Sequence, residues 1–436
     1  MTNHEEGTLD VVGVGVGPFN LSVAALLHPL GLRARFFERS PQFNWHAGLL
    51  FDESTLQVSF LKDLVTLADP TSPFSFLSFL FASRRLYRFI NADLPRVSRR
   101  EFNQYFRWVC DRLPSVEMGR AVEAVSFEGD AFRVHAGGER VRARNLVLGT
   151  GLSPAVPACA RPHLGRTVFH ASSFLEQGLD PSGKRVVVVG GGQTGAELVH
   201  QLLLNTARLP ASIHWITRRS NFLPLDESAF TNELFTPAYS EYFFSLPPDE
   251  RERLLFEQKL AGNGVSAGLL QQIYRRLYEL EFLSGAGRVC TLHAERDLVD
   301  LARDYDGWRL EYRKVYGGAR EALTADVVIL CTGWEYRRPE FLAPLGDRIP
   351  FDARGFAVRQ DFSVTWDGPE ENRIYVQNAA RHTHGVAEPN LSLMSWRSAT
   401  IVNSLAGRSV YDVADASTTF DWGRAPVPHL QEIAST

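Results

Sequence analysis

The sequence has little cysteine and none of the common cysteine motifs. Its 436 residues include four cysteines, and Cys110, Cys159, Cys290 and Cys331 form neither a CxxC pair nor a metal-site spacing. This scatter argues against a disulfide framework, a redox-active dithiol and a zinc site. No catalytic triad and no cluster of metal ligands is visible. We therefore expect buried free thiols and no bound metal.

The sequence also lacks a long hydrophobic run and a strong net charge. The N-terminal MTNHEEGTLD has no basic region followed by an apolar core, and no apolar run approaches the ~18 residues that span a bilayer. A net charge of −4 argues against general affinity for nucleic acid or anionic membranes. The length allows two or three domains. We expect a cytoplasmic protein that binds a small polar ligand, without nucleic-acid or membrane partners.

A glycine-rich stretch near the N-terminus, VVGVGVGPFN, predicts the strand, turn and helix of a dinucleotide-binding unit. Gly13 permits the tight turn, Gly15 lets the backbone approach a pyrophosphate, and the helix N-terminus favours phosphate. Pro18 stands where the usual fingerprint has its third glycine, and it suits a first helical turn. Glu38 ends the next strand-like run and can accept the ribose hydroxyls. The residues assigned to this first cofactor site are Gly13, Gly15, Gly17, Pro18, Asn20 and Glu38. The alternative is a glycine turn of another α/β protein.

A second stretch, GKRVVVVGGGQTGAEL, carries the complete fingerprint after four consecutive valines. A buried parallel strand is typical of such a valine run. Arg218 and Arg219 end the following strand, where an arginine accommodates a 2′-phosphate, so this unit should prefer NADPH to NADH. Solvated arginines are the alternative. The residues assigned to this site are Gly190, Gly192, Gln193, Thr194, Gly195, Arg218 and Arg219. An acidic first site and a basic second site imply electron transfer from NADPH to bound FAD.

The remaining segments fill out these two units. Residues 43–65 place Trp45, His46, Gln57 and Lys62 among apolar residues, and the segment is either a loop packed over the sheet with Lys62 exposed or a wall over the cofactor. Residues 98–109 predict a helix with an apolar stripe that serves packing. A Phe-rich stretch after Pro70 is core or an oligomer interface. Thr332 and Gly333 follow a strand, and the tail from residue 374 is expected to close one wall of the flavin site.

These patterns predict an α/β protein with two Rossmann-like dinucleotide-binding domains, for FAD and NADPH, and a smaller, mostly helical substrate region. Residues 1–160 and 326–436 are predicted to form the discontinuous FAD domain. Residues 161–222 and 284–325 are assigned to the NADPH domain, and residues 223–283 to a substrate or interface insert.

The sequence resembles the flavin-dependent amine N-hydroxylating monooxygenases of siderophore biosynthesis, most closely the lysine and diamine branch. The likeness covers about residues 9–422, and the shared motifs include GVGVGPFNLS, NWHAGLL, LQVSFLKDLV, VVVGGGQTGAE, DESAFTNELFTP, CTGW and THGVAEPNLSLMSWRSA. Pro18 in the glycine turn is what this family has. The resemblance implies FAD, NADPH and O₂, and a C4a-hydroperoxyflavin that waits for the amine while NADP⁺ is retained.

The resemblance also implies roles for single residues. Gln57 and Lys62 match positions near the substrate and the nicotinamide, and His46 matches the residue that lies with Trp45 over the flavin. Asn232 and, more loosely, Asn263 match substrate and cofactor contacts. Leu391 and Ser392 fall in the motif that lies beside the isoalloxazine and the reacting amine, and Thr332 and Gly333 are assigned to cofactor binding. We predict Lys62, Gln57 and Asn232 as catalytic residues, and Gln57, Lys62, Asn232, Asn263 and Ser392 as substrate-binding residues.

The predicted reaction is N-hydroxylation of the terminal amine of a diamine, putrescine or cadaverine, early in hydroxamate siderophore biosynthesis. L-lysine is the alternative, and L-ornithine ranks after it. The charge of Lys62 favours lysine, whose carboxylate it could pair with, whereas the stretch FTNELFTPAYSEYFF favours a diamine. A disulfide reductase, a monooxygenase acting on carbon or sulfur, and a non-catalytic nucleotide-binding module are rival classes. We expect a homo-oligomer, because the sequence has two aromatic-rich segments and because members of the family are often dimers or tetramers.

Overall fold

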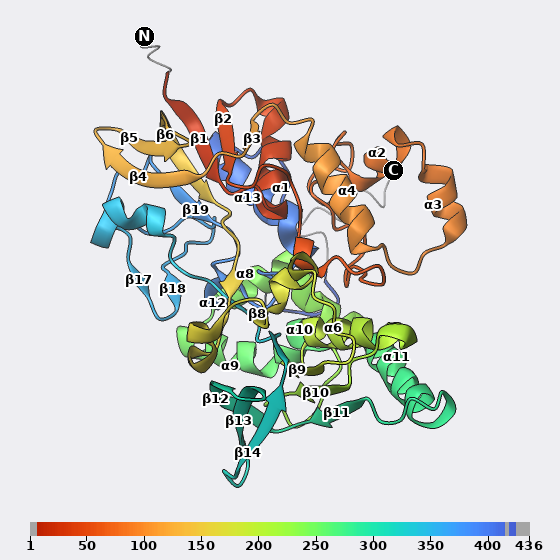
Figure 1. Cartoon of the computed structure of the whole chain (residues 1–436). Helices are drawn as coiled ribbons and strands as arrows, with labels where there is room; N and C mark the ends of the chain where they lie inside the picture. The colour runs from red at the N-terminus through yellow and green to blue at the C-terminus, as the bar shows by residue number, and fades with distance from the viewer. Residues whose placement is uncertain (1–6, 415–417, 424–436) are drawn as a thin grey trace.

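The structure is a computed structural model that describes residues 7–414 and 418–423, and it confirms the predicted α/β class (Figure 1). Two separate sheets with parallel cores lie at opposite ends of the molecule, and helices cover them. The outermost residues assigned to the FAD domain, 1–6 and 424–436, lie outside the described residues. Within the described part of the chain, no helix is long and apolar enough to cross a membrane.

The first sheet has the strand order β3-β2-β1-β6-β5-β4, and a further strand, β19, pairs with β6. Its central strands β2, β1, β6 and β19 are parallel, whereas β4, β5 and β6 form an antiparallel meander. Because β19 comes late in the sequence, the C-terminal part of the chain completes the sheet that the N-terminal part begins. The strands are β1 (Leu9–Val14), β2 (Ala34–Glu38), β3 (Val116–Met118), β4 (Val122–Glu128), β5 (Ala131–Ala136), β6 (Glu139–Leu148) and β19 (Ile374–Val376).

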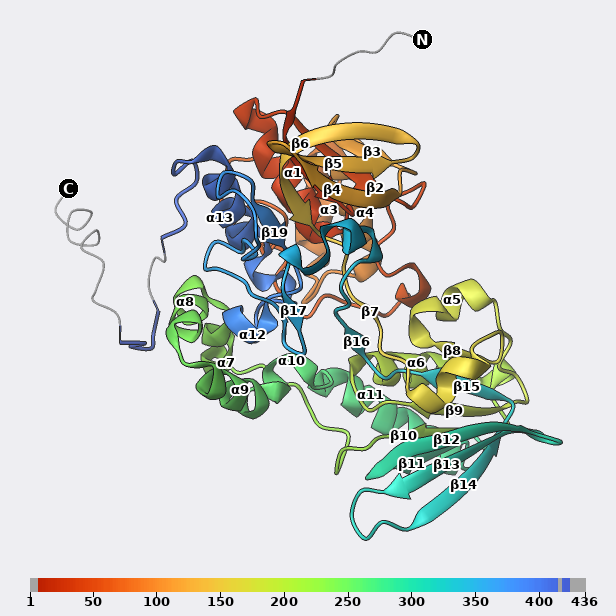
Figure 2. The same ribbon diagram turned by 90° about the vertical axis from the view of Figure 1, so that its left-hand side faces the viewer.

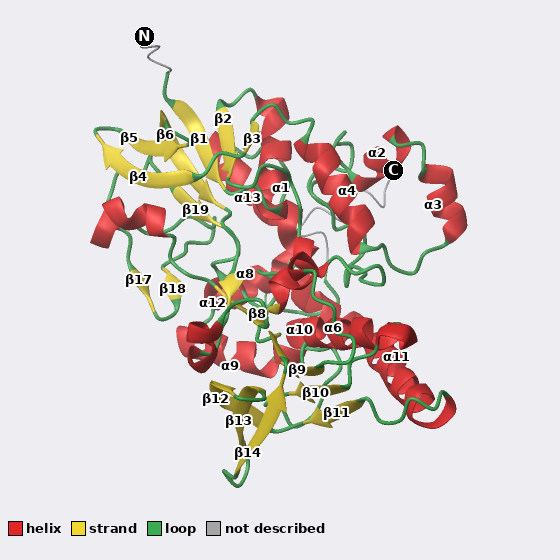
Figure 3. Ribbon diagram, viewed as in Figure 1, coloured by secondary structure: helices red, strands yellow, loops and turns green. Residues whose placement is uncertain are grey.

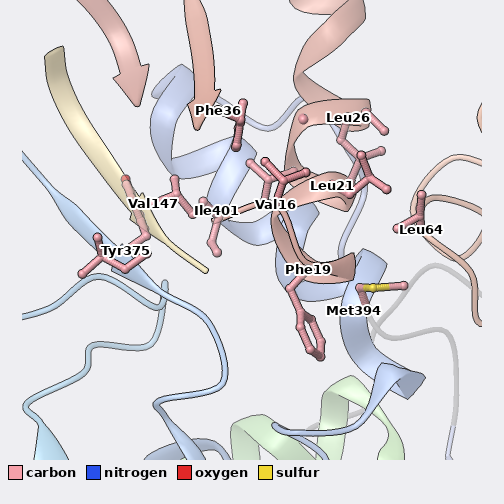
Figure 4. Packing of buried hydrophobic residues seen from close by; sticks show 14 of the residues in the cluster. Val16, Phe19, Leu21, Leu26, Phe36, Leu64, Val147, Tyr375, Met394 and Ile401 are labelled. Atoms are coloured by element: carbon pink, nitrogen blue, oxygen red, sulfur yellow. The ribbon is translucent and has the colours of Figure 1, made fainter. Parts of the chain in front are cut away.

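The core of this half is built around helix α1 (Pro18–Leu27), all ten residues of which are buried. Helices α13 (Met394–Ala406) and α4 (Arg99–Cys110) pack against it. Leu21 and Leu26 of α1 belong to the same buried cluster as Met394 and Ile401 of α13 (Figure 4). The predicted apolar stripe of α4 is confirmed, because Phe102, Tyr105, Phe106 and Val109 are all buried. Helices α2 (Phe76–Ala82) and α3 (Leu86–Ala92) lie beside α4 (Figure 3).

The second sheet is fully parallel, with the order β11-β10-β9-β15-β8. An antiparallel three-stranded sheet packs on one face, where Val187 and Val189 meet Trp308 and Leu310. Helices α5 (Phe174–Gln177), α6 (Gln193–Leu204) and α11 (Ala267–Tyr278) belong to this half. The strands are β8 (Val168–His170), β9 (Arg185–Val189), β10 (Ser212–Ile216), β11 (Cys290–His293), β12 (Arg296–Asp304), β13 (Gly307–Lys314), β14 (Arg320–Ala325) and β15 (Val327–Leu330).

Strand β15 corrects one predicted boundary. Residues 326–334 were predicted to return the chain to the FAD domain, but β15 pairs in parallel with both β9 and β8 of the second sheet. Its four residues are buried, as expected for a strand covered on both faces. The two halves are instead joined by β7 (Ser153–Pro154) and β16 (Trp334–Glu335), which pair antiparallel and run between the two sheets (Figure 2).

The predicted insert, residues 223–283, is helical but does not form a separate unit. Its last helix, α11, packs on α6 of the second half, and Val265 and Ile273 belong to that half's core. Phe235 and Ala261 instead belong to the core of the first half. The insert therefore bridges the two halves. Its other helices are α7 (Ala229–Asn232), α8 (Pro237–Ser245), α9 (Pro248–Glu257) and α10 (Lys259–Asn263), and α12 (Arg381–His384) packs against α8 and α9.

Candidate active site

The first glycine turn has the shape that a dinucleotide requires. A Cβ on Gly13 would lie 2.0 Å from the Phe36 ring. Gly15 has φ +84°, and a Cβ there would lie 2.6 Å from the carbonyl oxygen of Gly149. Gly17 is the N-cap of α1 and has open space around its missing side chain. Two glycines thus allow close packing, and the third leaves room above the helix N-terminus, where phosphate binds.

The residues next to this turn support it through hydrogen bonds. Glu38 accepts from the backbone N–H groups of Val16 and Ser40, both at 2.9 Å, so its carboxylate already fixes the turn and keeps lone pairs for a ribose. Asn20 corrects a prediction. It is 0% exposed, and its amide donates to the carbonyl oxygen of Gly15 at 2.8 Å. Asn20 therefore supports the turn from below, and its side chain has no surface left for a cofactor contact.

The second glycine turn is equally tight. Gly190 has φ +134°, and a Cβ there would lie 2.0 Å from the carbonyl oxygen of Cys331. A Cβ on Gly195 would lie 2.1 Å from the carbonyl oxygen of Gly190, so this glycine lets α6 sit close on the strand. Gly192, the N-cap of α6, faces open space. The turn fits a second dinucleotide.

A cleft of about 820 Å³ lies between the two halves and opens onto the second glycine turn. The sequence-predicted residues that line it come from segments far apart in the chain. They are Trp45, His46, Gln57, Gly190, Gly192, Gln193, Thr194, Arg218, Arg219, Asn263, Thr332, Gly333 and Leu391. The structure therefore brings most of the predicted NADPH and nicotinamide contacts into one place.

Positive charge gathers where the predicted 2′-phosphate would lie. Arg218 is exposed in the cleft, whereas Arg219 is half-buried and donates to the backbone carbonyl of Asn263 at 2.6 Å. Burial and the neighbouring Arg218 lower the pKa of Arg219. Lys259 and Arg381 line the same cleft and were not predicted from the sequence. Burial lowers the pKa of Lys259, and the nearby arginines lower it further. Such a group of cations gains stability when it binds a phosphate.

Two predicted contacts near the second turn are held by internal hydrogen bonds. The amide nitrogen of Gln193 donates to Glu197 at 2.8 Å, and its oxygen accepts from the backbone N–H of Ser266 at 2.9 Å. Thr332 donates to the carbonyl oxygen of Ala155 at 2.6 Å, and Gly333 has φ +90°. These bonds fix the floor of the cleft. The backbone of these residues is thereby placed beside the cofactor site.

Residues 43–65 form a wall of the cleft, which was one of the two alternatives. Trp45 and His46 lie with ring centroids 4.9 Å apart, and His46 lies 5.9 Å from the ring of Trp334 on the other half. His46 is exposed to solvent on one side, but the protein packed around its imidazole, together with the charge of Arg99, lowers its pKa to about 4, so this residue is neutral near pH 7. Gln57 presents an amide nitrogen that has no partner among the residues that the structure describes.

Three predicted site residues lie elsewhere. Lys62 is half-buried and Asn232 is exposed, and neither lines the cleft. Burial lowers the pKa of Lys62. Ser392 is buried, and its backbone N–H and its hydroxyl both donate to Asn390, at 2.9 Å each. Of the three predicted catalytic residues, Gln57 therefore lines the cleft, whereas Lys62 and Asn232 do not.

The sequence reasoning missed two features of the site. Gln377 and Asn378 follow β19 at the carboxyl edge of the first sheet, where ligands of such sheets bind. The side-chain oxygens of both residues are buried without a partner in the described part of the chain, and Asn378 has φ +59°. The sequence signal that could have identified them is a pair of polar residues directly after a short apolar strand. The second feature is the ion pair between Arg99 and Glu197, 2.7 Å long, which links α4 to α6 beside the cleft.

These features define a class of protein. The protein has two dinucleotide-shaped turns, one with an acidic and one with a cationic neighbour, and the cleft between the two halves opens onto the second. Two such turns are the plan of an oxidoreductase that passes electrons between two dinucleotides. The four cysteines are free. Among the described residues, no group of three His, Cys, Asp or Glu side chains could hold a metal ion.

Comparisons with known proteins give the family. The chain matches the family described as L-lysine 6-monooxygenase/L-ornithine 5-monooxygenase over residues 7–336. It is 41% identical to the L-lysine N6-monooxygenase of Escherichia coli over 95% of this chain and 98% of that protein. The chain therefore belongs to the L-lysine 6-monooxygenase/L-ornithine 5-monooxygenase family, which confirms the resemblance.

Solved structures agree with this assignment. The FAD-bound cadaverine monooxygenase of the desferrioxamine pathway from Erwinia amylovora has a TM-score of 0.88 and 33% identity, covering 95% of this chain and 99% of that one. The ornithine N-hydroxylase of Kutzneria sp. 744, with reduced FAD, NADP⁺ and L-ornithine, has a TM-score of 0.85 and 32% identity, covering 92% and 99%.

Proposed function

We propose that this enzyme uses FAD, NADPH and O₂ to hydroxylate the terminal primary amine of a small aliphatic substrate. The observation that carries the proposal is the cleft into which a cationic NADPH site and the wall of the flavin domain both open. Such a hydroxylamine product would be formed in an early step of hydroxamate siderophore biosynthesis.

The chain's own residues position and shield the reactants. FAD, when bound, supplies the activation of O₂. Arg218 and its cationic neighbours hold the nucleotide phosphate, and the rings of Trp45 and Trp334 line the cleft and exclude water beside it. His46 between them is neutral, so it introduces no charge that would repel a cationic amine. The task of the site is to hold the amine close and deprotonated.

L-lysine is the substrate that we favour. Lys62 is half-buried, burial lowers its pKa, and it has no ion pair with any residue in the described ranges. A substrate carboxylate would pair with this ammonium, whereas the second ammonium of a diamine would be repelled by it. The 41% identity to a lysine enzyme points the same way.

A diamine, which the sequence favoured, is the second candidate. Its support is the segment around Asn232, together with the close match to a cadaverine monooxygenase structure. Under this alternative, Lys62 would face the cofactor.

The deciding experiment measures hydroxylamine product, because NADPH oxidation alone also reports uncoupled peroxide formation. L-lysine, L-ornithine, putrescine and cadaverine are compared with the wild-type enzyme and with Lys62→Ala. We expect coupled product with L-lysine, and a rise in the lysine KM of Lys62→Ala with little change in flavin reduction. Coupled product with the diamines alone would establish the second candidate. Lys184→Ala, at a half-buried lysine of the second half, serves as the matched control.

The structure and the product assay also distinguish the rival reactions. A disulfide reductase needs a reactive dithiol, and only Cys331 of the four cysteines lines the cleft. Burial raises the pKa of the Cys331 thiol, which disfavours the thiolate. Oxygen transfer to a thioether in place of an amine would show the carbon or sulfur class instead.

We also infer a homo-oligomer. Phe81, Tyr87 and Ile90 on the neighbouring helices α2 and α3 are 74%, 85% and 62% exposed, and exposed large apolar side chains can mark an interface. A second copy of the chain would cover them. Light scattering should show a dimer or tetramer, and Tyr87→Glu together with Ile90→Glu should dissociate it. A monomeric wild-type protein at micromolar concentration would contradict the inference.

A further inference from the structure

A buried ion pair lies beside the predicted flavin site, and neither member was singled out from the sequence. Nη1 of Arg397 donates to Oε1 of Glu388 at 2.7 Å and to the backbone carbonyl of Glu388 at 2.8 Å. Glu388 is 4% exposed and Arg397 is 2% exposed. A pair buried this deeply loses much of its attraction to desolvation, so stability by itself is a weak reason for two charges here.

Arg397 connects this pair to the first glycine turn. It lies on α13, and its guanidinium carbon is 4.2 Å from the ring centroid of Phe19. Phe19 is in the first turn of α1, directly after the glycines, and Figure 4 shows its ring beside Met394 of α13. Nε and Nη2 of Arg397 have no hydrogen-bond partner among the described residues. The cation is thus held by Glu388 and by an aromatic face.

Glu388 connects the pair to the carboxyl edge of the sheet. Burial raises the pKa of Glu388, and Arg397 with the backbone N–H groups of residues 378–380 opposes that rise. These N–H groups belong to the turn that follows β19, where Asn378 has φ +59°. The backbone N–H of Gln377 donates to the carbonyl of Leu148 at 3.0 Å, and its side chain donates to Asn20 at 2.8 Å. The turn is therefore continuous with the first glycine turn.

Glu388 also precedes a wall of the cleft. Pro389, Asn390 and Leu391 line it, and Asn390 in turn accepts from Ser392 at 2.9 Å. Glu388 therefore begins the cleft wall and lies close to the N–H groups of the β19 turn, with Arg397 bonded to its side chain and to its backbone. Its Oε2 has no hydrogen-bond partner among the described residues.

We propose that Glu388 and Arg397 are positioning residues that hold the turn at residues 378–380 and the wall at residues 389–391 against the flavin. This inference rests on the proposed FAD site and does not depend on which amine is hydroxylated. The pair acts through these two backbone segments. Its loss should change how the flavin is bound and how its environment is charged.

The test compares Glu388→Gln and the double variant Glu388→Gln with Arg397→Met. The double variant removes both charges, so no unpaired buried ion remains and folding should be largely preserved. The control is Asp361→Asn with Arg373→Met, which removes a more exposed ion pair. That pair is 3.1 Å long and lies at the start of β19, whereas Glu388 faces the turn at the end of the same strand. Arg397→Lys, which keeps the charge, is the conservative variant and should stay closer to wild-type values than the double variant.

The readouts are the FAD dissociation constant of the apoprotein, the flavin midpoint potential and the fraction of NADPH electrons that forms peroxide. In the double variant we expect a rise of at least tenfold in the FAD dissociation constant, a shifted potential and a several-fold larger peroxide fraction. The control should keep wild-type values even if its Tm falls equally. Wild-type FAD affinity and potential in the double variant, or in Glu388→Gln where the double variant does not fold, would overturn the proposal.

Failure of the proposed function would look different. FAD affinity and midpoint potential are measured without any amine. An enzyme that hydroxylates no amine yet loses FAD in the double variant would refute the reaction and retain the positioning role.

Discussion

The two glycine turns of this enzyme share a backbone design and differ in what surrounds them. The first turn leads into α1, a helix buried along its whole length, and Glu38 accepts N–H bonds from the turn itself. The second turn leads into α6 at the edge of a wide cleft, with Arg218 and Arg219 beside it. The first turn is therefore packed against a buried helix and braced by a carboxylate, whereas the second lies beside an open cleft that carries positive charge.

This difference shows that the glycine turn provides the backbone geometry for a nucleotide, while the charged residues beside the turn select which nucleotide binds. Both turns offer a helix N-terminus to phosphate. Only the second adds full positive charge within reach of a 2′-phosphate. Substitutions at or near each turn test this difference.

The largest effect is expected from Gly190→Ala. Gly190 has φ +134°, and the new Cβ would lie 2.0 Å from the backbone oxygen of Cys331. Strain and overlap together should lower the free energy of unfolding by about 4 kcal/mol. The control is Gly192→Ala, where the added Cβ meets no atom within 4 Å, and about 1 kcal/mol or less is expected. Denaturant unfolding measures both, and equal losses would show that the second turn is not tightly packed.

Next comes the ion pair that joins the two regions. Glu197→Gln leaves Arg99 without its carboxylate, to which it donates at 2.7 and 2.9 Å. Since both side chains are largely buried, we expect a loss of about 3 kcal/mol in the free energy of unfolding. Arg253→Gln breaks an exposed pair with Glu257 and should cost less than about 0.5 kcal/mol. If urea titration finds the two variants alike, the link between α4 and α6 contributes little.

A smaller, selective effect is expected from Arg218→Ala. Losing a charge-assisted hydrogen bond should weaken NADPH binding by about 1.5–3 kcal/mol, or about 10- to 150-fold, and leave NADH nearly unchanged. Arg218 is the cleaner choice, because Arg219 also bonds the insert through Asn263. Arg208→Ala, in an exposed pair with Asp180, is the control. Equal losses for NADPH and NADH would remove the 2′-phosphate assignment.

The smallest effect concerns His46, on the wall between the two sites. Its pKa of about 4 lies below the ordinary value of the unfolded chain. The neutral imidazole therefore contributes its stability above about pH 6.5, and that contribution is lost as pH falls through 4. His46→Asn should leave the pH profile of NADPH binding unchanged between about pH 5.5 and 8.5. An inflection near pH 6.5 that disappears in this variant would show a titrating His46.

Much of the fold was predictable because it follows local rules. Valine runs before glycines predicted β1 and β9, and the spacing of Phe102, Tyr105, Phe106 and Val109 predicted the buried face of α4. The boundary at β15 was missed because the sequence of a buried parallel strand does not show to which of the two sheets the strand belongs. Asn20 was misjudged because proximity to a fingerprint does not reveal which way a side chain points.

The sequence by itself determined the two glycine turns, the acidic and basic neighbours that distinguish them, and the family, because each depends on residues close together in the chain. Only the tertiary structure decided that Arg99 meets Glu197 and that Glu388 lies between Arg397 and the turn after β19. Those contacts join segments up to about a hundred residues apart. Their energies depend on burial and distance, which no local pattern of residue types contains.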